Sequence, residues 1–242
     1  MKHVSIKNNK NNHMKLSESQ IQDLYAFTRQ HFVEHYDLQT ELVDHLANDI
    51  EAQWQVLPKL TFEDAKNKAF KKFGIFGFMD AIEQKAKAMN KRYMRYMWTE
   101  LKKWFELPQI IATIGLFLLF YLAFSSEFVA IASVVLYVLI ASWVMYKSIQ
   151  LNRQFRRRKE ISNKKWMLEE MIYKQAGATS LIFLSQIYNM FIISDEFLTN
   201  IYAVLGLSLA FTALVLINYI SFELIPNKAE KLLNETYPEF SL

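Results

Sequence analysis

Two apolar runs joined by a short polar link decide the fold: QIIATIGLFLLFYLAF over 109–124, SSE over 125–127, and FVAIASVVLYVLIASWVMY over 128–146. Neither run contains a charged residue. A helix needs about 20 apolar residues, with about 17 as the lower limit, to cross the hydrocarbon core of a bilayer. The second run meets this length, and the first reaches it only with Leu107 and Pro108. We expect an antiparallel transmembrane hairpin, because so short a link leaves no other arrangement.

A second pair of apolar runs follows the first. ATSLIFLSQIYNMFII covers 178–193 and IYAVLGLSLAFTALVLINYISF covers 201–222, again with a short polar link between them. The alternative for any one run is a core helix of a soluble protein, but four runs in two close pairs disfavour it. The sequence therefore predicts an all-α chain with an N-terminal helical domain followed by four transmembrane helices in two hairpins.

Charge places the segments on the two sides of the membrane. The two short links carry only the acids Glu127, Asp195 and Glu196, whereas Lys and Arg gather in 87–103, in 147–174 and in the C-terminal tail. Because basic residues concentrate in cytoplasmic segments, we expect both termini and the long basic loop to be cytoplasmic. Because the N-terminus is hydrophilic throughout, we expect no signal peptide. The expected location is the bacterial cytoplasmic (inner) membrane, with several passes.

The basic composition has two interpretations. A net charge of +4 and a pI near 9.0 are compatible with nucleic-acid binding. The cluster Arg156–Lys159, however, directly follows a predicted span, where basic residues contact anionic lipid head groups. We therefore expect membrane lipids as partners and no direct nucleic-acid contact. The predicted membrane-interface residues are Arg92, Arg95, Trp98, Lys102, Lys103, Trp104, Arg156, Arg157 and Arg158.

The predicted spans contain no Asp, Glu, Lys, Arg or His. Proton relays and ion-coupled transporters usually carry one inside the membrane. The polar candidates are Gln186, Asn189 and Asn218, which more often join helices than bind a substrate. The chain also has no cysteine, which excludes disulfides and thiolate metal sites. A transporter that acts alone is therefore not expected.

The sequence predicts four helices in the N-terminal domain. Ser17 and Gln20 form a capping box before the first, Asp37 can cap the second, and Thr61 with Asp64 opens the third. The fourth begins after Gly77 and is predicted to continue without a break into the first span. The apolar positions are Ile21, Leu24, Tyr25 and Phe32 on the first helix, Leu38, Leu42, Leu46, Ile50 and Trp54 on the second, Phe62, Ala65, Ala69, Phe70 and Phe73 on the third, and Ile82, Ala86, Met89, Tyr93 and Met97 on the fourth.

One motif carries potential catalytic chemistry. The segment from His31 to His35 fits the H-x-x-E-H pattern of inverted zinc proteases, with Glu34 as the general base. A spacing of four would place both imidazoles on one face of a helix, as zinc binding requires. A third protein ligand is needed, and only His45 or a nearby acid such as Asp44 is available. We expect histidines that pack beside the apolar side of the helix, no enzyme activity, no metal and no cofactor.

Residues 36–84 contain Tyr36-Asp37, then ELVDHL at 41–46, then TFEDA at 61–65, then Phe73-Gly74. This order resembles the small helical prefix domain that precedes permease-like membrane regions and occurs in bacterial proteins partnered with PadR-type transcriptional regulators. Pro58-Lys59-Leu60 and Ile75-Phe76-Gly77 depart from that pattern. The resemblance implies a signalling or protein-interaction module, and it points to Glu41, Asp44 and His45 as partner-binding residues.

The resulting hypothesis is a membrane-anchored, non-enzymatic regulatory protein whose helical domain binds a protein such as a PadR-type regulator. The alternative is a permease-type accessory or membrane subunit, with a transport subunit as the partner. Self-association into a homo-oligomer is compatible with both. The predicted segments are a disordered N-terminus (1–16), a cytoplasmic helical domain with a juxtamembrane helix (17–105), a hairpin (106–146), a basic loop (147–177), a second hairpin (178–222) and a cytoplasmic tail (223–242).

Overall fold

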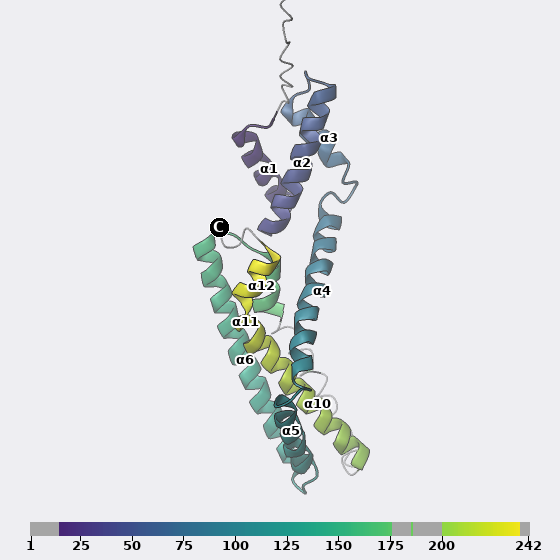
Figure 1. Cartoon of the computed structure of the whole chain (residues 1–242), viewed down its shortest axis with the longest axis vertical. Coiled ribbons are helices and arrows are strands. Elements are labelled where there is room, and N and C mark those ends of the chain that lie inside the picture. Colours follow the sequence, from purple (N-terminus) through teal and green to yellow (C-terminus); the bar gives the residue numbers. More distant parts are fainter. Residues whose placement is uncertain (1–14, 176–184, 186–199, 238–242) are drawn as a thin grey trace, which may run out of the picture. The chain divides into compact units, whose positions relative to one another are not determined.

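The computed structural model describes residues 15–175, 185 and 200–237 of the 242-residue chain (Figure 1). Every regular element in these ranges is a helix, so the predicted all-α class is confirmed. The helices form two compact units, Met1–Lys85 and Ala86–Leu242. Each unit buries its own set of apolar side chains.

The first unit is built around α2 (Tyr36–Val56), against which α1 (Glu18–Gln30) and α3 (Phe62–Lys71) pack. The predicted capping box at Ser17 is present, and Thr61 caps α3 by accepting a hydrogen bond from the Asp64 N–H. The predicted apolar side of α2 is buried at every position: Leu38, Leu42, Leu46, Ile50 and Trp54. Burying one such side chain contributes about 1.5–3 kcal/mol, so this side of α2 contributes a large share of the stability of the unit.

The junction between α1 and α2 differs from the prediction in two respects. The sequence pattern places Phe32 on the apolar side of the first helix, but α1 ends at Gln30 and Phe32 is 80% exposed with φ of 63°. The N-cap of α2 is His35, so Asp37 lies inside the first turn and is buried. Its carboxylate is 3.9 Å from Lys85 Nζ and close to the positive end of the helix dipole, which favours an acid at this position.

The loop that leads into α4 (Met79–Lys103) contains two glycines in the left-handed region, Gly74 with φ of 79° and Gly77 with φ of 54°. A Cβ atom at Gly77 would lie 2.9 Å from Phe70 Cζ. The next residue, Phe78, is buried, and its ring meets those of Phe70 and Phe73 at centroid distances of 4.9 Å. Glycine at 77 is therefore required by both the backbone conformation and the packing.

The prediction that the fourth helix runs unbroken into the first apolar run is wrong. α4 ends at Lys103, residues 104–108 form turns and bends, and α5 begins at Gln109. Pro108 provides the reason, because its ring disfavours the helical conformation at Leu107 and it has no N–H to continue the hydrogen-bond ladder. α4 and α5 are therefore joined by a turn and do not form one continuous helix that could transmit a movement of α4 rigidly to α5.

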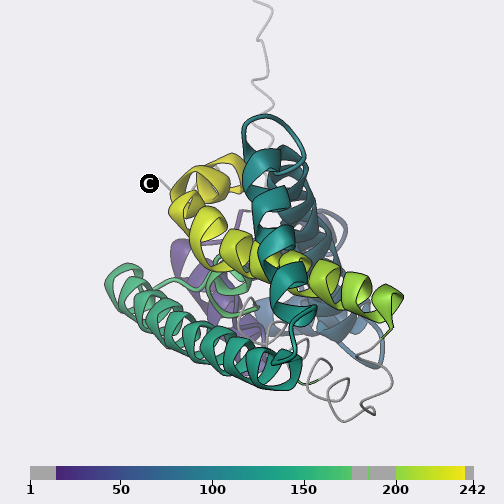
Figure 2. The ribbon, with the colours of Figure 1, turned by 90° about the horizontal axis from the view of Figure 1, so that it is seen from below.

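In the second unit, α5 (Gln109–Phe124) and α6 (Val129–Ser162) form an antiparallel pair joined by residues 125–128. α10 (Ile201–Tyr219) packs against α5 and crosses it in Figure 2. Aromatic rings make the contact: Phe211 of α10 lies 5.6 Å from Phe120 and 5.1 Å from Phe124, measured between ring centroids. These three rings are buried, which holds the two helices together.

Two described helices are long and apolar enough to cross a membrane, Ile131–Ser162 and Ile201–Asn227. α5 has 16 residues, slightly below the usual minimum of about 17 for a span. The predicted third span, 178–193, lies outside the described residues. The all-α architecture thus rests on the structure, and the four-span topology stays a prediction.

The segments predicted as a basic loop and a tail are largely helical. α6 continues through 147–162, which corrects the expected loop start, and the chain returns after the left-handed Asn163 as α7 (Met167–Glu170) and η1 (Met171–Gln175). At the C-terminal end follow η2 (Ile220–Leu224), α11 (Ile225–Asn227) and α12 (Ala229–Thr236). We call 147–174 and 220–237 the terminal layer. Its buried side chains include Leu151, Phe155, Leu168, Ile172, Phe222, Ile225 and Leu233.

Candidate functional site

The three predicted partner-binding residues share one exposed face of α2. Glu41, Asp44 and His45 are all exposed, on the side opposite the buried leucines. Glu41 is held by Lys85, whose Nζ lies 2.8 Å from Oε2. Asp44 and His45 form no hydrogen bond or ion pair with other residues that the structure describes, so their polar groups face solvent. A face that presents an acid and an imidazole without internal partners is available for recognition.

A hollow of about 250 Å³ lies beside His45, between α2 and the end of α3. An ion pair between Asp49 and Lys72 borders it. The remaining lining residues are Leu46, Ala69 and Phe73, so the floor is apolar and the rim is charged. The spacing of Glu41, Asp44 and His45 predicts their shared face, but the hollow depends on how α3 packs and has no signal within α2.

The zinc interpretation assumes that His31 and His35 lie on one face of the same helix, and the structure does not have this arrangement. α1 ends before His31, so the two imidazoles do not lie on one helix face. The His31 ring packs among Phe27, Phe70 and Phe78, and its Nδ1 lies 2.8 Å from the carbonyl oxygen of Phe27. Within 15–175 and 200–237, no group of three or more His, Asp or Glu side chains could hold a metal ion. His31 therefore acts as a packing residue of the aromatic cluster.

The predicted interface residues on α4 divide between solvent and protein. Arg92 is half-buried, Arg95 and Lys102 are exposed, and the ring of Trp98 is 59% exposed with Lys102 Nζ at 5.9 Å from its centroid. Lys103 pairs with Glu100 at 2.9 Å. Trp104 follows the helix and meets the ring of Tyr219 edge-on at 5.7 Å. An exposed Trp beside exposed cations is typical of a helix at a membrane surface.

The opposite side of α4 packs on the C-terminal end of the chain, a contact that the sequence does not reveal. Glu100 accepts a hydrogen bond from Lys228 at 2.7 Å, and Tyr96 Oη lies 3.4 Å from Thr236 Oγ1. Burial acts to raise the pKa of Glu100, but the hydrogen bonds from Lys228 and Lys103 outweigh it and lower that pKa. The carboxylate therefore links α4 to the terminal layer in its charged form.

Arg158, one of the predicted interface residues, forms an ion pair with a buried acid of the terminal layer. Its Nε donates to Glu169 Oε1 at 2.7 Å, and its Nη1 lies 3.6 Å from Glu230 Oε1. Glu169 is only 3% exposed. Burial raises the pKa of Glu169, and the hydrogen bond from Arg158 offsets this only in part. Arg158 therefore neutralises a buried carboxylate, whereas Arg156 and Arg157 are exposed.

A second ion pair and an aromatic contact complete the terminal layer. Lys147 lies 2.8 Å from Glu223, which joins α6 to η2. The ring of Tyr237 packs on Trp166 at 4.6 Å, and its hydroxyl accepts a hydrogen bond from the Leu168 N–H. Glu169 and Glu223, in segments that are mainly basic or apolar, are the only local signal of these pairs. They show that the residues after the apolar stretches are ordered by tertiary contacts.

Neither family models, curated proteins nor solved structures match this chain.

Proposed function

We propose that this chain is a multi-pass protein of the bacterial inner membrane whose N-terminal helical unit binds a regulatory protein in the cytoplasm. The observation that carries the membrane part is the surface of α6. Only 11% of its most apolar stretch is buried, against 50% for the corresponding stretch of α10. A core helix of a soluble protein would be mostly buried, so the exposed apolar surface of α6 supports a lipid environment.

The apolar surface continues over neighbouring helices. Large side chains that are at least half exposed include Ile111, Ile114 and Leu122 of α5 and Ile131, Val134, Val138 and Leu139 of α6. In water, each of these exposed side chains would forgo the free energy that is gained when apolar surface is buried away from water. In a bilayer the same side chains face lipid at no such cost. The proposed orientation comes from the sequence, because basic residues follow the apolar stretch of α6 and precede α5.

The polar side chains of α10 favour an anchor over a permeation path. Ser208 donates to the Val204 carbonyl, Thr212 to the Ser208 carbonyl and Asn218 to the Leu214 carbonyl, at 2.7, 2.7 and 2.8 Å. These groups hydrogen-bond to the backbone of their own helix, which is how polar residues are accommodated in a membrane. The permease-type alternative has no comparable support among the described residues.

The partner-binding part rests on the exposed face of α2. Asp44 and His45 present charge and hydrogen-bonding groups next to a hollow with an apolar floor. Such a combination of an apolar centre and a polar rim is typical of protein interfaces. The proposed partner is a soluble regulator, of the PadR type that the sequence resemblance implies, and the chain would hold it at the membrane.

Site-specific crosslinking in cells tests this proposal. A photoreactive amino acid replaces His45 in the full-length protein, and a matched control replaces Asp23, which is exposed on α1. We expect a crosslinked complex with a cytoplasmic regulator at position 45 and none at position 23. The substitutions Glu41→Gln and Asp44→Asn should weaken the crosslink, whereas Glu18→Gln and Asp23→Asn remove the same charge and should not. Crosslinking that is absent, or equal at both positions, would overturn the partner-binding proposal.

A further inference from the structure

The basic residues that follow the apolar stretch of α6 fall into two groups. Lys147 and Arg158 are paired with Glu223 and Glu169 in the terminal layer. Arg153 and Arg157 are exposed and form no ion pair or hydrogen bond with other residues that the structure describes. The fold has therefore neutralised some cations of this helix and left others open to a ligand.

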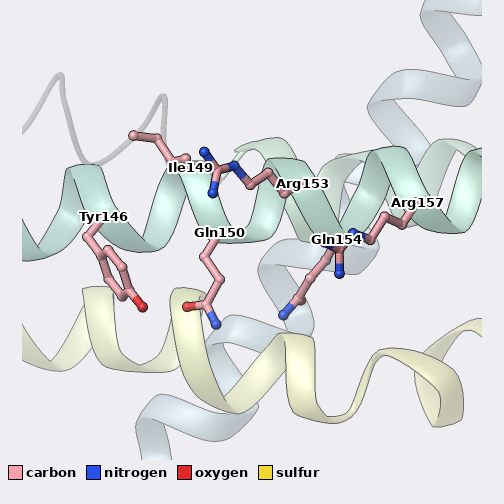
Figure 3. Close-up of a pocket in the computed structure, with 6 residues that line it drawn as sticks. All are labelled: Tyr146, Ile149, Gln150, Arg153, Gln154 and Arg157. Carbon is pink, nitrogen blue, oxygen red and sulfur yellow. The ribbon is translucent and has the colours of Figure 1, made fainter.

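The two open arginines line one face of α6. A hollow of about 450 Å³ runs along this face, and Figure 3 shows the side chains that line it: Tyr146, Ile149, Gln150, Arg153, Gln154 and Arg157. These positions recur at helical spacing, so they form one continuous strip. The strip offers two guanidinium groups, two amides and a phenol hydroxyl beside the apolar Ile149. Guanidinium forks bind phosphate oxygens in a bidentate manner, and amides and hydroxyls donate further hydrogen bonds.

The strip begins where the apolar stretch of α6 ends and leads through the head-group region toward the solvent. Tyr146 ends the apolar stretch, and Arg153 follows seven residues later, which is about 10 Å along a helix. The head-group region on each side of a bilayer core is about 5–8 Å thick. Side chains on a helix point back toward its N-terminus, and the N-terminal part of α6 is the apolar stretch. Arg153 therefore reaches back to the level of lipid phosphates, and Arg157, about 6 Å further along α6, can approach them from the solvent side.

We infer that this strip binds the phosphate of an anionic membrane phospholipid, with Arg153 and Arg157 as the charged contacts and Gln150 and Gln154 as additional donors. The inference rests on the proposed membrane location. It also moves the predicted lipid contact, because Arg158 is engaged with Glu169 and the strip uses Arg153 instead. Ile149 and Tyr146 would contact the glycerol and upper acyl region. Glu160, the only acid among residues 147–162, is not among the residues that line the hollow.

Lipid binding to the full-length protein tests the inference. Native mass spectrometry of the detergent-solubilised protein measures adducts with phosphatidylglycerol and with zwitterionic phosphatidylcholine as probes. The variant Arg153→Ala/Arg157→Ala removes the charged contacts, and Lys159→Ala/Lys231→Ala removes the same charge from exposed positions outside the strip. At about 1 kcal/mol for each basic residue near an anionic surface, the first variant should bind phosphatidylglycerol about 30-fold more weakly. The control should change binding less than about threefold, since its residues do not line the strip.

Three results would overturn the inference. Equal loss in both double variants would mean unspecific charge attraction, and equal binding of both lipids would mean that no phosphate site for anionic lipid exists. Competition by free glycerol phosphate at the concentration of the lipid would identify a site for a soluble phosphate compound. If Arg153→Ala/Arg157→Ala lowers the thermal stability, Arg153→Lys/Arg157→Lys retains the charge and should keep binding within about fivefold. A protein recovered from the soluble fraction of cells would instead contradict the proposed membrane location.

Discussion

The pair of Arg158 and Glu169 gives the sharpest prediction for stability. The substitution Arg158→Met keeps the length and apolar contacts of the side chain but leaves the carboxylate of Glu169, which is 3% exposed, without its partner. Breaking a fully buried pair costs about 3–5 kcal/mol. Arg158 is 30% exposed, so solvent screens part of the interaction, and we expect a loss of about 2–3 kcal/mol at pH 7.

The same variant should show a characteristic pH dependence. Burial already raises the pKa of Glu169 above its ordinary value of 4.5, and Arg158 is the group that opposes this rise. Without Arg158 the pKa of Glu169 in the folded protein rises further above 4.5. Glu169 of the folded variant is then protonated, and no longer an unpaired buried charge, over a wider pH range. The destabilisation of Arg158→Met should therefore shrink as the pH falls and grow as the pH rises.

Thermal unfolding of the purified full-length protein in detergent measures this effect. Tryptophan fluorescence reports on the terminal layer through Trp166, which is buried there. A loss of 2–3 kcal/mol corresponds to a shift of about 5–10 °C for a chain of this size. The double variant Arg158→Met/Glu169→Leu removes the charge that is left behind and should recover most of the loss. A single variant within about 1 °C of the wild type, or a double variant as unstable as the single one, would refute the buried ion pair.

Two further predictions concern α4 and the loop before it. Glu100→Gln should cost about 1 kcal/mol at neutral pH, because Lys228 is partly exposed and the pair is screened. The pKa of Glu100 is lowered in the folded protein, so the stabilising effect of its carboxylate is present above the ordinary pKa of 4.5 and is lost as the pH falls through the folded-state pKa. Below that pH, thermal unfolding should give the same stability for the variant and the wild type. Gly77→Ala should destabilise the first unit by about 2–3 kcal/mol, through the left-handed backbone and the contact with Phe70. Gly74→Ala is the matched control: its Cβ meets nothing within 4 Å, so hydrogen exchange of the α2 amides should show a smaller loss, about 1–2 kcal/mol.

Local patterns explain which parts of the fold were predictable. The apolar side of α2 repeats at helical spacing from Leu38 to Trp54, and every position is buried. Thr61 and Ser17 cap their helices as short-range hydrogen bonds require. Pro108 could have indicated the break after α4, since the restriction on its preceding residue is also local. The extension of α6 to Ser162 differs from the predicted loop because a cluster of cations marks the end of a membrane span but not the end of its helix, and Arg, Lys, Gln and Glu are good helix formers.

The contacts of the terminal layer were not predictable by the same reasoning. Lys147 and Glu223 are 76 residues apart, and Glu100 and Lys228 are 128 residues apart. Periodicity reports on one helix at a time and carries no information about which helix lies opposite. For the same reason the sequence predicted that Glu41, Asp44 and His45 share a face, but it could not predict the hollow, which α3 completes.

The central claim is that α5, α6 and α10 belong to a membrane-spanning region with the basic residues inside the cell. The chain has no cysteine, so a single introduced cysteine gives an unambiguous labelling site. Glu127→Cys, Lys159→Cys and Lys231→Cys are placed in the full-length protein, and intact cells are treated with a membrane-impermeant thiol reagent. The account predicts labelling at position 127 in intact cells, and labelling at positions 159 and 231 only after permeabilisation. Labelling at 159 or 231 in intact cells, or protection of 127 until the membrane is opened, would contradict it.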